Sequence, residues 1–593
     1  MIVKNNPKNK TFDFTLLKRV FAYTKKYSGL FVFTATTTVL LAVLAPIRPY
    51  IVQYIVDHSL IQKDYQQLVM LTILMIGILI IESLLQYFFI YNSSYIAQGI
   101  IKDIRKQLFD KIIHFKLSYF DKSSIGQLVT RVISDIEVIA EVFSEGFLMI
   151  IGDVLKLLFI IGFMFYINWS LTLIVLIPIP LLIYATVIFK KVIKEAYQEV
   201  RKQAGILGAF VQEHIVGMNI VQVFNREEVE YQKFKAINKQ HMKAHIKTVW
   251  AYSVFFPVVE ILSAISIALL VWWGFKDVIK SQNIEPGIIF SFILYIYMLY
   301  RPIRQLADRF NTLQRGMVGA ERVFKILDTD ASIENKGTLD AKNIEGNIEF
   351  KNIWFAYNDE DWILKDLCLS IKKGENIAFV GSTGAGKTTI INLLGRYYDI
   401  NKGDILIDNH SVKDYELYSL RKSMTIVMQD VFLFSDTIFN NITLNNPEIN
   451  RNMVIEAAKK IGAHDFISQL PNGYDYNVKE RGSLLSVGQR QLIAFIRAYV
   501  HNPKILILDE ATSSVDSESE ALIQHATEII TKNRTSIIVA HRLSTIQNAD
   551  KIVVIEKGKI IEMGNHFELI KNDNGHYKKL YELQFKELLN TNT

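Results

Sequence analysis

The chain has 593 residues, of which 50% are hydrophobic and 21% charged, with a formal net charge of +7. This length exceeds that of a single domain, and a positive mean hydropathy with so many charges excludes an entirely soluble protein. The one cysteine, Cys368, excludes an intrachain disulfide framework, and we expect it in a buried strand between Leu367 and Leu369.

Residues 1–29 form a basic N-terminal segment. The first apolar run begins near Leu30 and is too long for the core of a cleavable signal peptide. Phe14, Leu17, Val20 and Phe21 can share one helical face, which predicts an interfacial helix lying along a membrane. The alternative is an amphipathic start without lipid contact.

Residues 30–330 predict a membrane domain of six α-helices. Each apolar stretch can cross a hydrocarbon core of about 30 Å at about 1.5 Å per residue. The last is short and is expected to continue as a helix through residues 301–327. The stretches are residues 30–51, 68–91, 147–167, 171–189, 250–273 and 288–300.

Two long basic loops, residues 92–146 and 190–249, alternate with short loops that carry few lysines. By the positive-inside rule both termini and both long loops are cytoplasmic, in a multi-pass protein of the inner (cytoplasmic) membrane. The loops have the pattern of helical extensions with tips at residues 119–131 and 214–227. We expect these tips to dock onto a soluble domain and bury their apolar faces; the alternative is two solvated turns.

Charged side chains inside apolar spans are costly and are candidates for function. A cavity lined by them and by Tyr295, Tyr297 and Tyr300 is predicted to hold an amphiphile, either a cation near the glutamates or a lipid head group near Lys156 and Arg48. The alternative is a structural ion pair of Lys156 with Glu82 or Asp153, with tyrosines that only pack. The charged candidates are Arg48, Glu82, Asp153, Lys156 and Glu260.

Residues 331–345 form a polar linker, and residues 346–593 have the composition of a soluble α/β domain. Strands alternating with helical patterns in its later part are typical of a P-loop ATPase core. The predicted strands are residues 347–355, 363–371, 376–380, 405–407, 424–427, 504–508, 535–540 and 552–555.

The segment GSTGAGKTT fits the P-loop pattern between a predicted strand and a predicted helix. Its backbone N–H groups can surround phosphate oxygens, Lys387 can reach the β- and γ-phosphates, and the Thr388 hydroxyl can bind Mg²⁺. The sequence therefore predicts ATP and Mg²⁺ bound by Gly381, Ser382, Thr383, Gly384, Ala385, Gly386, Lys387, Thr388 and Thr389.

Three further motifs follow the P-loop. The strand KILILDE ends in Asp509, placed to support Mg²⁺, and Glu510, placed to polarise the attacking water. LLSVGQRQ precedes it, and His541 ends the strand TSIIVAH.

In this order and spacing the motifs resemble the ATP-binding cassette (ABC) exporters over nearly the whole chain. The resemblance implies that Tyr357 stacks on adenine, that Gln429 contacts Mg²⁺ and senses the membrane domain, and that His541 contacts the γ-phosphate. It further implies a signature motif at Ser486, Gly488 and Gln489, and a D-loop at residues 513–516.

The family further implies a half-transporter that works only as a dimer, with two ATP molecules closed between two cassettes. The expected activity is ATP-driven export of a lipid or hydrophobic compound by alternating access. Residues 125–128 and 217–221 are the expected sites that couple ATP closure to the spans.

One position departs from the family. Val487 stands where the signature usually has glycine, and its branched side chain lies where close backbone approach is wanted. This is compatible with a homodimer, which we slightly favour, or with a heterodimer having one weakened ATP site.

Alternatives of other classes are an ATP-gated channel or regulator on the same scaffold, and a peptide exporter, disfavoured because no protease domain precedes the spans. No nucleic-acid partner is expected.

Overall fold

The computed structural model describes residues 14–142, 147–281, 285–358, 360–509, 517–539 and 546–582. The chain divides into a helical unit, Met1–Ile113 with Ser124–Asp330, and a cassette unit, Ala331–Thr593 with His114–Ser123. Each unit has its own hydrophobic core.

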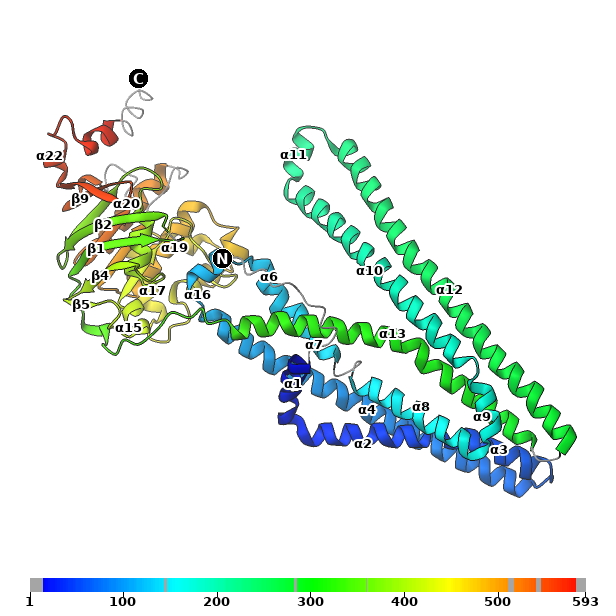
Figure 1. The fold of residues 1–593 in the computed structure, drawn as a ribbon. Coiled ribbons are helices and arrows are strands. Elements are labelled where there is room, and N and C mark those ends of the chain that lie inside the picture. Colours follow the sequence, from blue (N-terminus) through cyan, green and yellow to red (C-terminus); the bar gives the residue numbers. More distant parts are fainter. Residues whose placement is uncertain are drawn as a thin grey trace. The chain divides into compact units, whose positions relative to one another are not determined.

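The helical unit consists of long helices joined by short breaks (Figure 1). Two of the breaks fall next to Pro46 and Pro178, which lack the N–H that would continue the helix. The principal helices are α1 (Phe14–Ala22), α2 (Ser28–Leu44), α3 (Ile47–Tyr54), α4 (Tyr65–Ile113), α6 (Ile125–Thr130), α7 (Ile136–Glu141), α8 (Leu148–Ile167), α9 (Trp169–Leu176), α10 (Ile179–Val216), α11 (Met218–Val223), α12 (Glu227–Ser281) and α13 (Pro286–Asp328).

Among the described residues, five helical segments are long and apolar enough to cross a membrane: Thr15–Leu60, Tyr65–Ile113, Leu148–Ile167, Trp169–Val216 and Glu227–Gly274. They contain the first five predicted spans. The sixth predicted span lies on α13, which is not among these five, and Arg301 directly follows its apolar stretch. A sixth crossing therefore stays a prediction.

Helix α13 lies in the core of the helical unit, where Phe292 and Ile296 are fully buried. The Tyr295 hydroxyl donates to the carbonyl of Pro46 at 2.7 Å, and the Tyr300 hydroxyl lies 2.8 Å from Ser266 Oγ. These two tyrosines therefore pack inside the bundle, and their prediction as part of a cavity lining is wrong. Tyr297 is exposed.

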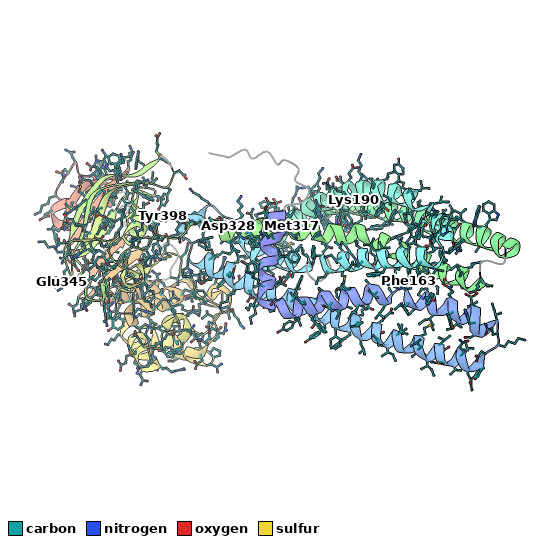
Figure 2. All side chains as sticks on the ribbon, turned by 60° about the horizontal axis from the view of Figure 1, so that its bottom comes forward. Phe163, Lys190, Met317, Asp328, Glu345 and Tyr398 are labelled. Carbon is teal, nitrogen blue, oxygen red and sulfur yellow. The ribbon has the colours of Figure 1, made fainter. Side chains whose placement is uncertain are left out.

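The N-terminal helix α1 packs against the helical unit. Leu17 and Val20 of its apolar face are buried against protein rather than open to lipid. Arg19 donates to both carboxylate oxygens of Asp328, each at 2.6 Å, and its guanidinium lies 4.2 Å from the ring centroid of Phe324. Asp328, labelled in Figure 2, is the last residue of α13, so α1 anchors the end of that helix.

The cassette unit contains an antiparallel sheet of order β2-β1-β4-β5 and a largely parallel sheet of order β10-β9-β3-β8-β7-β6. All eight predicted strands are present; β5 and β10 were not predicted. The strands are β1 (Ile348–Ala356), β2 (Trp362–Ile371), β3 (Asn376–Val380), β4 (Lys402–Ile407), β5 (His410–Ser411), β6 (Met424–Val427), β7 (Ile505–Asp509), β8 (Thr535–Val539), β9 (Lys551–Glu556) and β10 (Lys559–Gly564).

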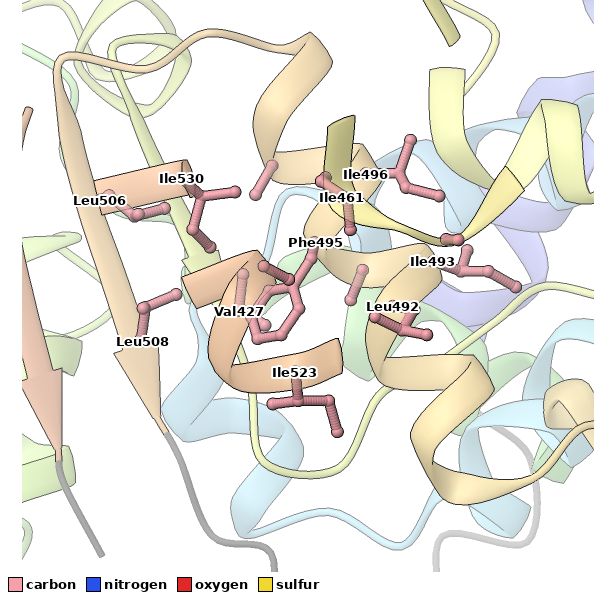
Figure 3. Close-up of a cluster of buried hydrophobic side chains, with 14 of the residues drawn as sticks. Val427, Ile461, Leu492, Ile493, Phe495, Ile496, Leu506, Leu508, Ile523 and Ile530 are labelled. Carbon is pink, nitrogen blue, oxygen red and sulfur yellow. The ribbon is translucent and has the colours of Figure 1, made fainter. Parts of the chain in front are cut away.

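The parallel sheet is packed against helices, of which α19 is central (Figure 3). Phe495 and Ile493 of α19 meet Leu506 and Leu508 of β7 in one buried cluster, so the position of α19 relative to the sheet is fixed by its core. The helices of the unit are α5 (Leu117–Asp121), α14 (Lys387–Leu394), α15 (Leu417–Lys422), α16 (Ile438–Thr443), α17 (Arg451–Ile461), α18 (His464–Gln469), α19 (Val487–Val500), α20 (Ser517–Thr531) and α22 (His566–Leu569).

Cys368 is exposed, which corrects the prediction that it is buried. It lies on β2, an edge strand, between the buried Leu367 and Leu369. Because successive side chains of a strand point to opposite faces, burial of both neighbours turns Cys368 outward.

Of the predicted tip at residues 119–131, residues 119–123 belong to the cassette unit, as part of His114–Ser123, and the rest belongs to the helical unit. The Lys116 N–H donates to the carbonyl of Ala331 at 2.7 Å, and the Tyr398 hydroxyl donates to Asp121. The contact thus lies a few residues earlier in the chain than the predicted 125–128.

Candidate nucleotide-binding site

The P-loop joins β3 to α14, with glycines where other residues do not fit. Gly386 has φ +107°, and a Cβ there would lie 2.7 Å from a methyl of Leu364. A Cβ on Gly381 would overlap the carbonyl oxygen of Ile555. The loop therefore depends on glycine both for its backbone conformation and for its packing against neighbouring strands.

Lys387 lies over this loop. Its Nζ donates to the carbonyls of Gly381 at 2.6 Å and Ser382 at 3.0 Å. Burial lowers the pKa of the ammonium, and the nearby Asp509 carboxylate opposes part of that shift. A cation beside a helix N-terminus and a glycine turn is an arrangement that attracts a phosphate chain.

Thr388 and Asp509 come together from different elements. The Thr388 hydroxyl lies 3.5 Å from an Asp509 carboxylate oxygen, at the carboxyl end of β7. Hydroxyl and carboxylate oxygens are hard donors of the kind Mg²⁺ prefers, so this pair fits the predicted metal site.

Tyr357 lies beside α14, and the residue is 38% exposed. Its hydroxyl donates to Thr389 at 3.3 Å and accepts from the Asn392 side chain at 3.4 Å. The predicted adenine-stacking ring is thereby held next to the phosphate-binding helix with area available for a base. The Tyr398 ring meets the Tyr357 ring edge-on, with 5.0 Å between the centroids. The sequence did not predict that Asn392 and Tyr398 support this site. The adjacent aromatic pair Tyr397–Tyr398 after α14 was the available signal.

The signature segment begins α19. Ser486 Oγ accepts from the Gln489 N–H at 3.1 Å, and Gln489 Oε1 accepts from the Ser486 N–H at 3.0 Å. This reciprocal capping fixes the first turn, with Gly488 buried and Val487 45% exposed. The departure at Val487 therefore places a branched side chain on the surface at the N-terminus of α19.

Gln429 is exposed just after β6, which pairs in parallel with β7, so it lies at the same edge of the sheet as Asp509. The predicted catalytic residues Glu510 and His541, and the D-loop at 513–516, lie outside the described residues. Glu510 follows β7 and His541 comes two residues after the end of β8, and these strands are parallel neighbours.

A second candidate site is a cavity of about 370 Å³ in the helical unit. Arg48 Nε lies 3.0 Å from a Glu82 oxygen, without the angle of a hydrogen bond, and Arg309 donates to Asp153. The alternative given above, an ion pair of Lys156 with Glu82 or Asp153, is therefore not what the structure shows, because these carboxylates pair with Arg48 and Arg309. Among the described residues neither Lys156 nor Arg301, which also line the cavity, forms an ion pair. Glu260 is exposed on α12 and does not line it.

Residues 31–303 match the family described as the ABC transporter transmembrane region, and residues 364–513 match the ABC transporter family. The chain is 37% identical to an ATP-dependent lipid A-core flippase of Syntrophus aciditrophicus, over 96% of this chain and 95% of that protein. It is 36% identical to the putative ABC transporter ATP-binding protein exp8 of Streptococcus pneumoniae, over 98% and 100%. It is 35% identical to the uncharacterized ABC transporter ATP-binding protein YknV of Bacillus subtilis, over 97% and 96%. With both regions matched in one polypeptide, the chain belongs to the ABC transporter family.

Proposed function

We propose that this protein couples ATP hydrolysis to the export of a lipid or other amphiphile across the cytoplasmic membrane. The observation that carries the proposal is the union, in one chain, of a P-loop cassette with apolar helices that enclose a charged cavity. Several similar proteins are named lipid A-core flippases, which supports a lipid as the substrate.

Each group in the cassette has a role in this proposal. The P-loop amides and Lys387 bind the triphosphate, and Tyr357 stacks on the base. Mg²⁺ would be held by Thr388 and Asp509, with Gln429 at the same edge, and supplies charge neutralisation at the β- and γ-phosphates. Glu510 polarises the attacking water and His541 contacts the γ-phosphate.

The working unit is a dimer with both cassettes and both termini in the cytoplasm. Ser486, Gly488 and Gln489 of one chain complete the ATP site of the other. The exposed Val487 does not disturb the cap that holds Ser486, which slightly favours a homodimer. Reconstitution of the purified chain alone tests the homodimer. We expect ATP turnover from this chain by itself, and turnover that requires a sister chain would contradict the homodimer.

The loop tips transmit closure of the cassettes. The first tip is tied to its own cassette through Asp121 and Lys116. The second tip, α11, presents apolar side chains to solvent, with Ile220 66% and Val223 74% exposed. Such exposure supports the prediction that this tip also docks.

The cavity favours an anionic head group over a cationic drug. Its carboxylates, Glu82 and Asp153, are already paired with Arg48 and Arg309, whereas Lys156 and Arg301 form no ion pair with any residue that the structure describes. Lys156 is half-buried, and a cation in an apolar span without an ion-pair partner is costly, so an anionic ligand relieves that cost. The substrate class we propose is therefore an amphiphile with a negative head group.

The experiment is ATPase stimulation in lipid nanodiscs by anionic and zwitterionic lipids and by cationic drugs. Lys156→Gln is expected to lower stimulation by anionic lipids selectively, while Lys190→Gln, outside the cavity lining, is not. The assignment would be contradicted if Lys156→Gln kept its full stimulation of ATPase by anionic lipids and both variants were stimulated equally by cationic drugs. Glu510→Gln separates transport from gating, because a gate that need not hydrolyse ATP would keep wild-type behaviour.

A further inference from the structure

The second long loop is closed at its base by two residues from different helices. The helices α10 and α12 are joined through the tip helix α11 (Figure 1). His214 lies in the last turn of α10 and Glu230 in the first turn of α12, and His214 Nε2 lies 3.0 Å from Glu230 Oε2. One turn further from the tip, the rings of Phe210 and Phe234 meet with 6.3 Å between their centroids. The His214–Glu230 contact therefore fastens α10 to α12 directly below α11.

Both ring nitrogens of His214 face hydrogen-bond acceptors. Nδ1 lies 2.8 Å from the carbonyl oxygen of Phe210, and Nε2 faces the Glu230 carboxylate. A neutral imidazole has one N–H and can donate to only one of these oxygens, whereas an imidazolium donates to both. The ring also stacks on that of Phe210, with 3.8 Å between centroids, and an aromatic face favours a cation. The arrangement is thus fully satisfied only by the protonated ring.

The Glu230 carboxyl does not supply a shared proton. Its other oxygen, Oε1, accepts from Arg226 at 3.2 Å and from Lys233 at 2.9 Å, which leaves Oε2 to His214. The contacts with Lys233, His214 and Arg226 lower the pKa of Glu230 to about 2, so this side chain is an anion near neutral pH. The proton between Glu230 and His214 therefore belongs to the ring.

The charges packed around the ring come from α10 and from the start of α12. The contacts with Glu230 and Phe210 raise the pKa of His214, desolvation opposes part of the rise, and the Glu213 carboxylate adds to it. The tip helix α11 carries no charged residue. The other charged residues around the start of α12 are Arg226, Glu227, Glu228 and Lys233.

The direction of the pH dependence follows from the raised pKa of His214. Because the pKa is higher in the folded protein, both hydrogen bonds of the ring are formed below about pH 6.5, the ordinary pKa of histidine. They are lost as the pH rises through the pKa of the folded protein, where the neutral ring keeps one N–H and one of its two acceptors. The base of the tip therefore loosens on the alkaline side.

We infer that His214 is a pH-sensitive latch for the second loop tip. As an imidazolium it ties α10 to α12 and holds α11 in one orientation, and on losing a proton it releases the tip. Since α11 presents Ile220 and Val223 for docking, the latch sets how well this tip transmits closure of the cassettes. That consequence rests on the proposed function, whereas the latch itself does not.

The first test measures the protonation midpoint of each histidine by histidine hydrogen–deuterium exchange and mass spectrometry, on the full-length protein in nanodiscs without nucleotide. The His214 midpoint should lie above that of His241, which is on α12 and forms no ion pair with any described residue. Glu230→Gln keeps the side-chain shape and removes the charge, and it should lower the His214 midpoint by about one pH unit while leaving His241 unchanged. The same His214 midpoint in wild type and Glu230→Gln would overturn the latch.

The second test follows amide exchange over residues 214–230 at pH 6.0 and pH 8.0. Wild type and variant are compared at one pH, which removes the intrinsic pH dependence of amide exchange. At pH 6.0 His214→Gln should exchange several-fold faster than wild type, and at pH 8.0 the ratio should shrink; the control His241→Gln should match wild type at both. An equal ratio at both pH values would reduce His214 to a packing role and overturn the switch.

The consequence for coupling is measured separately, as the ratio of lipid-stimulated to basal ATPase. In wild type this ratio should fall between pH 6.5 and pH 8.0, and in His214→Gln it should depend less on pH. Equal pH dependence in both proteins would show that the latch does not govern coupling. If no lipid stimulates the wild type, the proposed function fails, while the two exchange measurements still decide the latch.

Discussion

The hydroxyl of Tyr398 donates a hydrogen bond to the carboxylate of Asp121, 277 positions earlier in the chain. Burial raises the pKa of this hydroxyl, and the contact with Asp121 adds to the shift, so it remains a donor at neutral pH. The same ring meets the edge of Tyr357, which is hydrogen-bonded to Thr389 of α14. A continuous set of contacts thus joins the predicted adenine site to the tip of the first long loop.

We expect Tyr398→Phe to uncouple substrate from hydrolysis. The variant keeps the ring and its packing but loses a hydrogen bond worth about 1 kcal/mol. Lipid-stimulated ATPase should fall several-fold while basal ATPase changes little. Tyr397→Phe is the control, because the Arg421 guanidinium lies 4.8 Å from that ring centroid and the ring is kept. A similar loss of stimulation in both variants would contradict the role of the Asp121 contact.

The Thr388–Asp509 pair predicts that variants at either residue need more Mg²⁺ for ATP hydrolysis. Thr388→Val removes one oxygen of the pair and preserves side-chain size. The Mg²⁺ concentration for half-maximal ATPase should rise roughly 10- to 100-fold, the range found when a metal site loses a supporting contact. A Mg²⁺ titration of Asp509→Asn should show the same direction. Unchanged Mg²⁺ dependence in both variants would remove this pair from the metal site.

The sequence predicted the parts of the cassette that depend on contiguous patterns. Eight strands were found because each contains a run of residues with several buried apolar positions, continuous as in β3 and β8 or interrupted as in β1 and β2. Strand β5 has only two residues, and β10 alternates half-buried and exposed positions at the sheet edge, so neither produces such a run. The P-loop was found for the same reason, since its geometry is set within nine consecutive residues.

Pairings between distant residues could not be predicted in this way. An ion pair through Lys156 was one alternative for the cavity charges, but the structure pairs Arg48 with Glu82 and Arg309 with Asp153. Which charges meet depends on the rotation and depth of each helix, and these are set by packing that no local pattern records. The Tyr398–Asp121 contact was missed for the same reason.

The end of α19 predicts a dependence of stability on pH. Burial lowers the pKa of His501, a hydrogen bond to the backbone of Ile442 opposes the shift, and Arg497 and Lys422 add to it. Above the unfolded-state pKa of about 6.5, the His501 ring is neutral in both the folded and the unfolded protein. Below that pH the ring binds a proton in the unfolded chain but not yet in the folded protein. The free energy of unfolding therefore falls as the pH falls.

The midpoint of thermal unfolding of the cassette, followed in the detergent-solubilised protein, should therefore decrease between pH 7.5 and 5.5. His501→Asn should reduce that decrease, whereas the exposed His525→Asn on α20 should not. The same decrease in wild type and His501→Asn would contradict this origin.

The start of α13 predicts a position that accepts only glycine. The Asp57 carboxylate accepts from the Gly287 N–H at 2.6 Å and so caps the helix from another segment, where a negative charge also meets the positive helix end. A Cβ on Gly287 would overlap both this carboxylate and the carbonyl oxygen of Gln53. We expect Gly287→Ala to destabilise the helical unit by about 1–3 kcal/mol, measured as a lowered unfolding temperature in detergent. Gly162→Ala on α8 is the matched control, since a Cβ there has nothing within 4 Å and alanine favours a helix. If Gly287→Ala is as stable as Gly162→Ala, the Asp57 cap does not constrain this helix start.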